Sequence, residues 1–180
     1  LADKLSKDGK NSVLILEAGG KDWHPLIHIP AGFYKIHNDP KLNWNYSSEP
    51  EKGLNGRSID IPRGKVLGGS SSINGMVYMR GHPLDYDGWA NNLGLDQWSY
   101  SNCLPYFKDL ENSDRGGNEW RGDKGALGVR KGPDPNPIYD TFLAAGEQSG
   151  QGITDDLNGF NPEGLSRLDA TISNGRRNSS

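Results

Sequence analysis

The sequence predicts an α/β protein that contains an incomplete Rossmann-like βαβ unit. Residues 1–7 place Leu1, Ala2 and Leu5 at helical spacing, and a polar turn follows them. Val13–Leu16 is then an unbroken apolar run, which is typical of a parallel strand buried on both faces. Helix, turn and buried strand form the second half of a βαβ unit, whose ligands lie beyond the carboxyl ends of the strands.

An acidic side chain stands at this carboxyl end. Glu17 follows the apolar run directly, with Ala18 beside it. In a nucleotide-binding sheet, a carboxylate at this place accepts hydrogen bonds from ribose hydroxyls. The alternative is an ordinary solvent-facing glutamate, which the segment alone favours because no glycine fingerprint precedes it. That fingerprint would end just before Leu1, so its absence decides nothing.

The remainder of the chain alternates between loops and a few regular elements. Proline, asparagine and aromatic residues give 21–60 little periodicity, and we expect a loop-rich excursion there. Pro105 fits only the first turn of a helix. The other expectations are a strand at 57–61, a Gly/Ser-rich loop at 64–75, helices at 86–93, 99–111 and 137–149, a polar connection at 112–137 and a strand at 165–172.

Composition excludes several classes of protein. Only 33% of the 180 residues are hydrophobic, while 25 are glycine and 11 are proline, which is thin for a self-contained core. Twenty basic and 23 acidic residues give a net charge of −3, with no electrostatic footprint for nucleic acid. No apolar run approaches the ~20 residues that span a bilayer. Because the hydrophobic share is so low, we expect an internal piece of a longer protein, which has lost part of the core that it would pack against.

Cysteine and histidine usage bears on compartment and metals. Cys103 is the single cysteine, so no internal disulfide can form and a reducing compartment is the default. We expect a cytoplasmic protein, with peripheral association to an inner membrane as the alternative. The four histidines show no metal-ligand spacing, and we predict no metal site.

Residues 62–81 carry the strongest chemical signal in the sequence. Gly68 and Gly69, followed by three serines, can bring bare backbone against a ligand, with N–H groups and hydroxyls as donors to phosphate or ring atoms. A flexible serine–glycine linker is the alternative. Apolar residues on both sides argue against it, because a linker needs no buried anchors: Val66, Leu67, Ile73, Met76 and Val77.

The order and spacing of the fixed positions in this stretch resemble a known family signature. The matching residues are Gly64, Lys65, Leu67, Gly68, Gly69, Ser70, Ser71, Ile73, Asn74, Tyr78, Gly81 and Asp87. They resemble the first signature of the glucose–methanol–choline (GMC) family of flavin-dependent alcohol oxidoreductases. The likeness extends along the whole chain. Residues 155–160, with Glu163 and Gly164, look most like the choline dehydrogenase branch.

The resemblance implies FAD as the cofactor. Glu17 would bind the ribose of its adenosine half, and Trp44 matches an aromatic near the cofactor, with a plain core tryptophan as the open alternative. Some members attach FAD through a histidine where this chain has Ile73, so we predict non-covalent FAD. The predicted cofactor-binding residues are Glu17, Ala18, Trp44, Val66, Gly68, Gly69, Ser70, Asn74, Gly75, Met76 and Val77.

The resemblance also implies a reaction and a division of the chain. The reaction is oxidation of a primary alcohol by hydride transfer to flavin N5, with choline to betaine aldehyde as the first candidate. The alternatives are another aliphatic, aryl or sugar alcohol, or flavin binding without redox turnover. The electron acceptor is oxygen or a quinone-linked partner. Residues 1–135 would form the FAD-binding region, with a lid at about 30–60, and 136–180 would begin an α+β substrate domain. Nothing in 1–180 matches the family's catalytic histidine, so we expect the isolated chain to be inactive.

Overall fold

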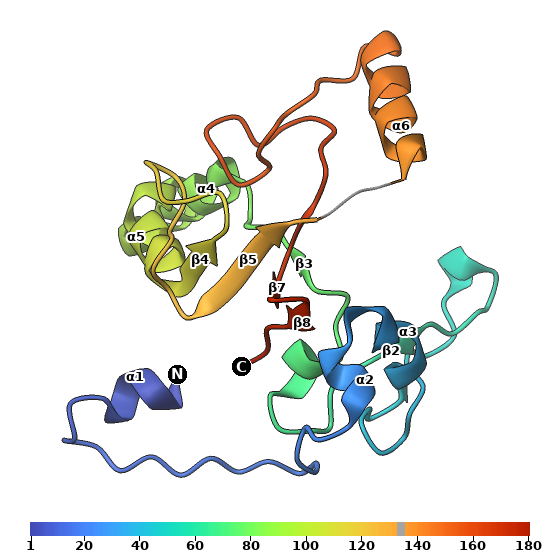
Figure 1. Cartoon of the computed structure of the whole chain (residues 1–180), viewed down its shortest axis with the longest axis vertical. Helices are drawn as coiled ribbons and strands as arrows, with labels where there is room; N and C mark the ends of the chain where they lie inside the picture. The colour runs from blue at the N-terminus through green and yellow to red at the C-terminus, as the bar shows by residue number, and fades with distance from the viewer. Residues whose placement is uncertain (133–135) are drawn as a thin grey trace. The chain divides into compact units, whose positions relative to one another are not determined.

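A computed structural model describes residues 1–132 and 136–180 and divides the chain into two compact units (Figure 1). Unit 1 comprises residues 1–74 together with Ser180, and unit 2 comprises residues 75–179. The predicted boundary at residue 135 lies outside the described residues. It stays a prediction, because compactness alone does not say which part binds cofactor and which binds substrate.

Unit 1 is built from short elements around a small apolar core. Side chains from well-separated segments meet there, and the buried cluster consists of Ile27, Ile36, Leu42, Val66 and Ile73. The elements are α1 (Ala2–Ser6), α2 (Pro25–His28), η1 (Pro30–Gly32), α3 (Phe33–Ile36), β1 (Tyr46–Ser47), η2 (Lys52–Leu54), β2 (Asp60–Ile61) and η3 (Gly69–Ser72). β1 and β2 form an antiparallel pair, so the strand expected within 57–61 is present but only two residues long.

The segment at 25–36 is helical where a loop was expected. Pro25 occupies the first turn of α2, and the ring Nδ1 of His24 caps it by accepting a hydrogen bond from Leu26 N at 3.3 Å. Ile27 and Ile36 are almost completely buried. Helices of three or four residues show no repeat for periodicity to detect, and their stability comes from this packing.

The expectation of a buried strand at Val13–Leu16 is wrong. This segment is extended but belongs to no strand, and its side chains are exposed, up to 87% for Leu16. A parallel strand needs hydrogen-bonded neighbours, and none of the described residues pairs with 13–16. The first pairing comes later, in a parallel bridge between Gly20 and Val66.

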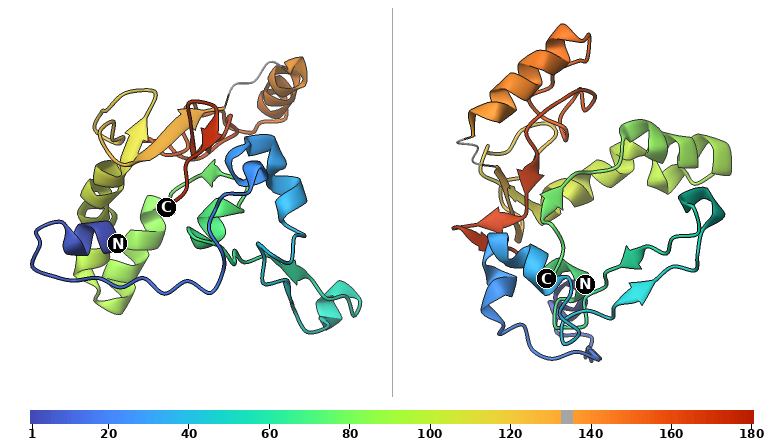
Figure 2. Two further views of the ribbon diagram at one scale, coloured as in Figure 1. Left: turned by 60° about the horizontal axis from the view of Figure 1, so that its bottom comes forward. Right: turned by 90° about the vertical axis from the view of Figure 1, so that its right-hand side faces the viewer.

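Unit 2 combines three longer helices with a mixed four-stranded sheet (Figures 1 and 2). The sheet order is β3-β6-β5-β4, with β4 and β5 parallel and the other pairs antiparallel. β7 and β8 form a separate antiparallel pair. The elements are β3 (Val77–Tyr78), α4 (Pro83–Leu93), η4 (Asp96–Trp98), α5 (Tyr100–Leu110), β4 (Glu111–Ser113), β5 (Leu127–Lys131), α6 (Pro137–Gln148), β6 (Asp169–Ala170), β7 (Ile172–Ser173) and β8 (Arg176–Arg177).

The expected helices of unit 2 are confirmed, with one correction. α4 and α5 lie against each other, and the Asp87 carboxylate on α4 accepts a hydrogen bond from the Tyr100 N–H that opens α5, at 2.9 Å. Pro105 is the sixth residue of α5 and lies inside the helix, not in its first turn. The missing N–H costs one helical hydrogen bond, which the packing of both helices offsets.

Strands β4 and β5 lie in a region where a polar connection was expected. Gly128 interrupts the apolar pattern of β5, and β4 is a polar three-residue strand, so neither shows the alternation that predicts a strand.

No described helix is long and apolar enough to cross a membrane.

Candidate functional site

The structure brings the segment around Glu17 beside the glycine–serine loop. Gly20 and Val66 form a parallel bridge, and Leu67 N donates to Gly20 O at 2.8 Å. A Cβ on Gly19 would stand only 2.0 Å from Lys65 O, so these backbones approach as closely as glycine allows. The segment that follows the predicted cofactor residues Glu17 and Ala18 therefore lies beside the segment that carries Val66, within unit 1.

The loop that follows is ordered by its own hydrogen bonds. Gly68 and Gly69 adopt left-handed backbone angles, with φ of 89° and 56°, which favour glycine. Gly69 N donates to Val66 O at 2.7 Å, and the hydroxyls of Ser71 and Ser72 donate to the carbonyls of Gly68 and Leu67 at 2.7 and 2.9 Å. These bonds are the features of a fixed loop and contradict the alternative of a flexible linker.

Gly64 closes this loop from the other side and leaves one face of it bare. Its N–H donates to Ser70 Oγ at 3.1 Å, and a Cβ on Gly64 would stand 2.2 Å from Gly69 O. A Cβ on Gly69 would meet nothing within 4 Å. The backbone at Gly69 thus faces open space without side-chain cover, as a loop that receives a phosphate or a ring requires.

Glu17 presents its carboxylate at the surface of unit 1. Its Oε1 accepts a hydrogen bond from Gly19 N at 2.7 Å, which fixes the side chain at the end of the extended segment. The side chain is otherwise exposed, as is Ala18. A carboxylate held in this way keeps acceptor capacity for ligand hydroxyls.

Trp44 is not a core tryptophan, because 41% of its surface is exposed. Its ring lies parallel to that of Tyr46, with centroids 6.0 Å apart and planes 3° apart. The Lys65 ammonium stands 4.7 Å from the Trp44 ring centroid in a cation–π contact. This arrangement excludes the core alternative and places an aromatic face beside the signature residue Lys65.

The remaining predicted cofactor residues differ in what they expose. Val66 is completely buried, so only its backbone can meet a ligand. Asn74 is exposed at the end of unit 1. Unit 2 begins with exposed Gly75, followed by Met76, which is buried at φ 61°. Val77 on β3 is 55% exposed. The assignment of all these residues to cofactor binding stays a prediction.

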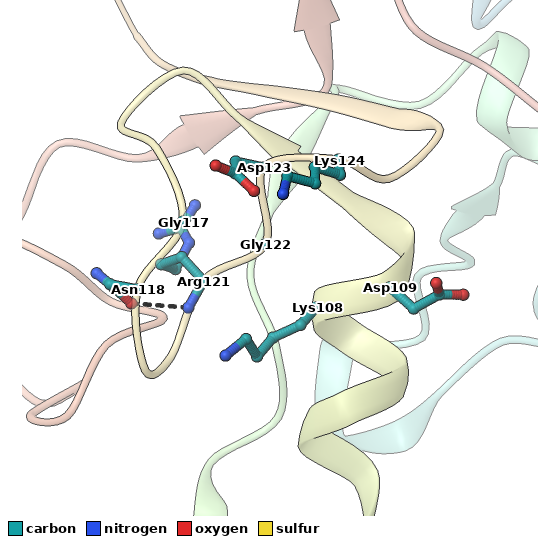
Figure 3. Close-up of a pocket in the computed structure, with 8 residues that line it drawn as sticks. All are labelled: Lys108, Asp109, Gly117, Asn118, Arg121, Gly122, Asp123 and Lys124. Atoms are coloured by element: carbon teal, nitrogen blue, oxygen red, sulfur yellow. Dashed lines mark hydrogen bonds between the residues drawn. The ribbon is translucent and has the colours of Figure 1, made fainter.

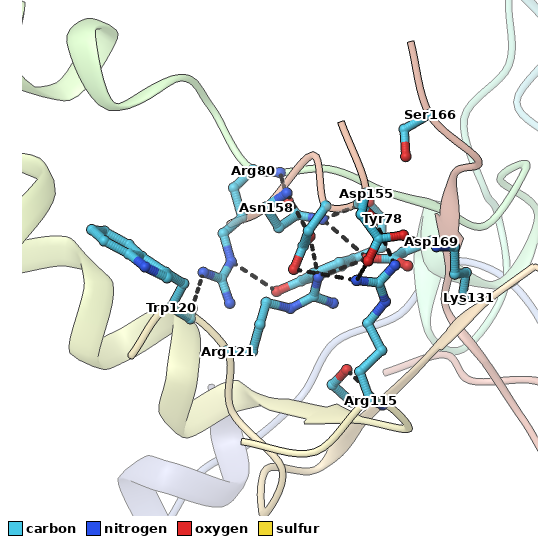
Figure 4. A network of polar contacts seen from close by, with 12 residues as sticks. Tyr78, Arg80, Arg115, Trp120, Arg121, Lys131, Asp155, Asn158, Ser166 and Asp169 are labelled. Atoms are coloured by element: carbon cyan, nitrogen blue, oxygen red, sulfur yellow. Dashed lines mark hydrogen bonds and ion pairs between the residues drawn. The ribbon is translucent and has the colours of Figure 1, made fainter. Parts of the chain in front are cut away.

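Unit 2 contains a buried ionic network that sequence reasoning missed (Figure 4). Its centre is the carboxylate of Glu111, which is fully buried at the start of β4. Glu111 accepts from Arg80 Nη2 at 2.6 Å, Arg121 Nε at 2.9 Å and Gly122 N at 3.0 Å. Arg80 also donates through Nη1 to Trp120 O at 2.7 Å. The network joins β4 to the loop 114–126.

Arg121 carries the network onward to two further carboxylates. Its Nη1 donates to Asp156 Oδ1 at 2.6 Å and to Asp169 Oδ2 at 2.8 Å. Burial by itself would lower the pKa of Arg121, but the hydrogen bond and charge of Glu111, with Asp169 and Asp156, raise it above its ordinary value. Asn158 ties the network to β3, since its Nδ2 donates to Tyr78 O at 3.3 Å, and its Oδ1 accepts from Arg80 N at 2.8 Å. Arg121 is therefore a permanently charged centre of unit 2.

A surface pocket of about 500 Å³ lies beside this network (Figure 3). It is lined by Lys108, Asp109, Gly117, Asn118, Arg121, Gly122, Asp123 and Lys124. Charges of both signs border it, and Asn118 Oδ1 already accepts from the Arg121 N–H at 2.8 Å. The pocket holds none of the predicted cofactor residues, so the candidate site is the glycine–serine loop with its neighbours.

The sequence of almost the whole chain matches one protein family. Residues 7–180 fit the profile of GMC oxidoreductases. The chain belongs to the GMC oxidoreductase family. It is 51% identical over 177 residues to an oxygen-dependent choline dehydrogenase from Rhizobium etli and 50% identical to one from Sinorhizobium fredii. In each case 98% of the chain is covered, but only 32% of the relative, so the chain spans about a third of the length of these relatives.

Solved structures of GMC flavoenzymes confirm the predicted fold class, the FAD-binding α/β region of this family. Pyridoxine 4-oxidase from Mesorbium loti matches with a TM-score of 0.92 and 32% identity, over 98% of this chain and 35% of that one. An FAD-dependent oxidoreductase from Chaetomium thermophilum matches with a TM-score of 0.86 and 28% identity, over 99% and 32%. Membership confirms FAD as the cofactor, and the bare loop face at Gly69 fits such a group.

Proposed function

We propose that this chain is the FAD-binding part of an oxidoreductase that converts a primary alcohol to an aldehyde, with choline as the substrate. The ordered loop Gly64–Asn74, whose backbone is bare at Gly69, is the observation that carries the proposal. The choline dehydrogenase from Rhizobium etli supports this choice of substrate, because it shares 51% sequence identity with nearly the whole chain. The word "oxygen-dependent" in their names favours oxygen as the electron acceptor.

The residues of unit 1 would divide the work of holding FAD. The exposed Glu17 carboxylate would accept hydrogen bonds from ribose hydroxyls of the adenosine half. The backbone at Gly68, Gly69 and Ser70 would receive the pyrophosphate and flavin, since bare N–H groups make an anion-binding concavity. Trp44 would pack its exposed aromatic face near the cofactor. When bound, FAD would supply the hydride acceptor, and this chain's residues would orient it.

Non-covalent attachment follows from the chemistry of Ile73. Its side chain is apolar and 1% exposed, inside the core of unit 1. A covalent bond to the flavin needs a nucleophilic side chain, which an alkyl group cannot supply. FAD should therefore leave the protein when it is denatured. No catalytic base is assigned within residues 1–180, and we propose that the isolated chain does not turn over.

A second substrate class has its own support. The pyridoxine 4-oxidase structure matches this chain with a TM-score of 0.92. Pyridoxine is an aromatic primary alcohol, so an aryl alcohol is the main alternative to choline. Choline recognition would need a carboxylate or an aromatic cage for the quaternary ammonium, and no residue of this chain is assigned to one. The third candidate is a flavin-binding protein without redox turnover.

The test is purification of the full protein that contains this chain, from cells with ample riboflavin. A yellow protein whose flavin is released by acid or heat is the expected result. Choline added without oxygen should then bleach the flavin absorbance. Bleaching by pyridoxine but not choline would move the proposal to the second substrate class, and a colourless protein would overturn it altogether.

A further inference from the structure

A histidine distant in sequence holds the glycine–serine loop of unit 1. The ring Nε2 of His37, which follows α3, lies 2.6 Å from the carbonyl oxygen of Ile73. A carbonyl can only accept, so Nε2 carries the proton and donates it. The ring also makes an edge contact with Phe33, with centroids 5.6 Å apart. This ring therefore has one orientation, with its donor on the loop.

The backbone of His37 is itself fixed by a buried side chain. The carbonyl of His37 accepts a hydrogen bond from the Nδ2 of Asn43, which is 4% exposed. The Oδ1 of Asn43 accepts from Arg63 N at 2.8 Å and from Asn45 N at 3.1 Å. Because a buried amide with several partners cannot rotate without leaving polar groups unpaired, it gives the histidine a rigid support.

The hydrogen bond reaches the peptide unit that leads into Asn74. The carbonyl of that unit belongs to Ile73 and accepts from His37, while its N–H belongs to Asn74 and donates to Ser70 O at 2.9 Å. Both polar groups of one peptide plane are thus held. The buried Ile73 side chain anchors the same residue in the core. The direction in which Asn74 projects is set by these three contacts.

We propose that His37 is a positioning residue for the cofactor loop, which acts by fixing the Ile73–Asn74 peptide. This inference rests on the proposed function, because Asn74 is a predicted cofactor residue. His37 would act through this peptide and not by direct contact with FAD. Loss of its donor leaves the Ile73 carbonyl unpaired and lets the peptide turn, which should weaken FAD binding about tenfold or more.

The test compares variants of the flavin-loaded full protein. His37→Phe keeps a ring of similar size but removes the N–H donor, and His37→Gln restores a donor. His28→Phe is the matched control, because its ring Nε2 lies 2.7 Å from Asp22 O, a carbonyl of the same unit that is not part of the loop 64–74. The readouts are the FAD dissociation constant and the visible circular dichroism of the bound flavin.

We expect His37→Phe to weaken FAD binding and change the flavin dichroism, His37→Gln to retain both, and His28→Phe to leave both as in the wild type. Should His37→Phe fail to fold, His37→Gln and His37→Met form a second pair of similar shape, with and without the donor. Equal FAD binding by donor and donor-free variants would overturn the role of His37 alone. A wild-type protein without flavin would instead overturn the proposed function.

Discussion

Arg121 and Glu111 form a fully buried ion pair at the centre of unit 2, with Arg121 Nη2 2.6 Å from Glu111 Oε1 and neither side chain exposed. Arg80 stands 2.6 Å from the other carboxylate oxygen and is nearly as buried. Ionised groups are expensive to bury unless they are paired and hydrogen-bonded, and here one carboxylate serves two guanidinium groups. The loop 114–126 is held to β4 by this pair and by the backbone hydrogen bonds from Ser113 N to Gly122 O and from Gly125 N to Glu111 O, at 2.9 and 2.8 Å.

Glu111→Gln should therefore destabilise the protein strongly. The substitution removes a charge on which two buried arginines depend, and breaking such a pair costs about 3–5 kcal/mol. Urea unfolding of the full protein, followed by circular dichroism, would measure the change. Asp8→Asn is the control, because its pair with Lys10 is largely exposed and is worth at most about 1 kcal/mol. Equal effects of the two substitutions would show that the network contributes little.

Asp155 should make stability depend on acid pH. The hydrogen bond from Lys131 and the charge of Arg115 lower the pKa of Asp155 below its ordinary value of 3.8 (Figure 4). A carboxyl whose pKa is lowered by folding stabilises the folded state above its unfolded pKa, and this contribution is lost as pH falls through the folded pKa.

Asp155→Asn should accordingly be less stable than the wild type near neutral pH. The difference should shrink as pH drops below about 5 and vanish only once pH lies below the lowered pKa of Asp155. The effect is small because the Asp155 side chain is exposed and screened by solvent. Thermal midpoints across this range, repeated in about 0.5 M salt to screen the pairs, would measure it. A difference that stays constant with pH would rule out the ionic explanation.

Much of the fold could be predicted from local sequence, and the failures have physical causes. Helices α4, α5 and α6 carry start signals and apolar repeats, and both features can be recognised in a short stretch of sequence. Val13–Leu16 has the pattern of a buried strand, but burial depends on partner strands that the pattern does not contain. Strands such as β3, β6, β7 and β8 are only two residues long and are defined by their partners.

The candidate site likewise has features that the local sequence predicts and features that it does not. The pair Gly68 and Gly69 predicted the loop from sequence alone, because backbone with positive φ strongly favours glycine. The Glu111 network and the bond from His37 to Ile73 join residues far apart in sequence. No local pattern marks such pairs, and a single sequence gives no distances between them.

Glu17→Gln should weaken FAD binding without unfolding the protein. The amide keeps the shape of the side chain but gives up the charge that strengthens hydrogen bonds to hydroxyl groups, which contribute roughly 1.5–3 kcal/mol when charged. We expect the FAD dissociation constant to rise about tenfold or more, measured by flavin fluorescence on reconstitution of the apoprotein. Glu49→Gln, an exposed carboxylate outside the predicted site, is the control. Unchanged binding in Glu17→Gln would remove the ribose role.

Gly64→Ala tests whether close backbone packing shapes the cofactor loop. The new Cβ would stand 2.2 Å from Gly69 O and 2.7 Å from Ser70 N, and both contacts are with backbone that cannot rotate away. The loop must move, so bound FAD should be largely lost at purification while far-ultraviolet circular dichroism changes little. Gly53→Ala is the matched control, because its Cβ would meet nothing within 4 Å and its φ is not left-handed. If both variants retained flavin equally, the loop would tolerate displacement and its backbone geometry could not be what holds the cofactor.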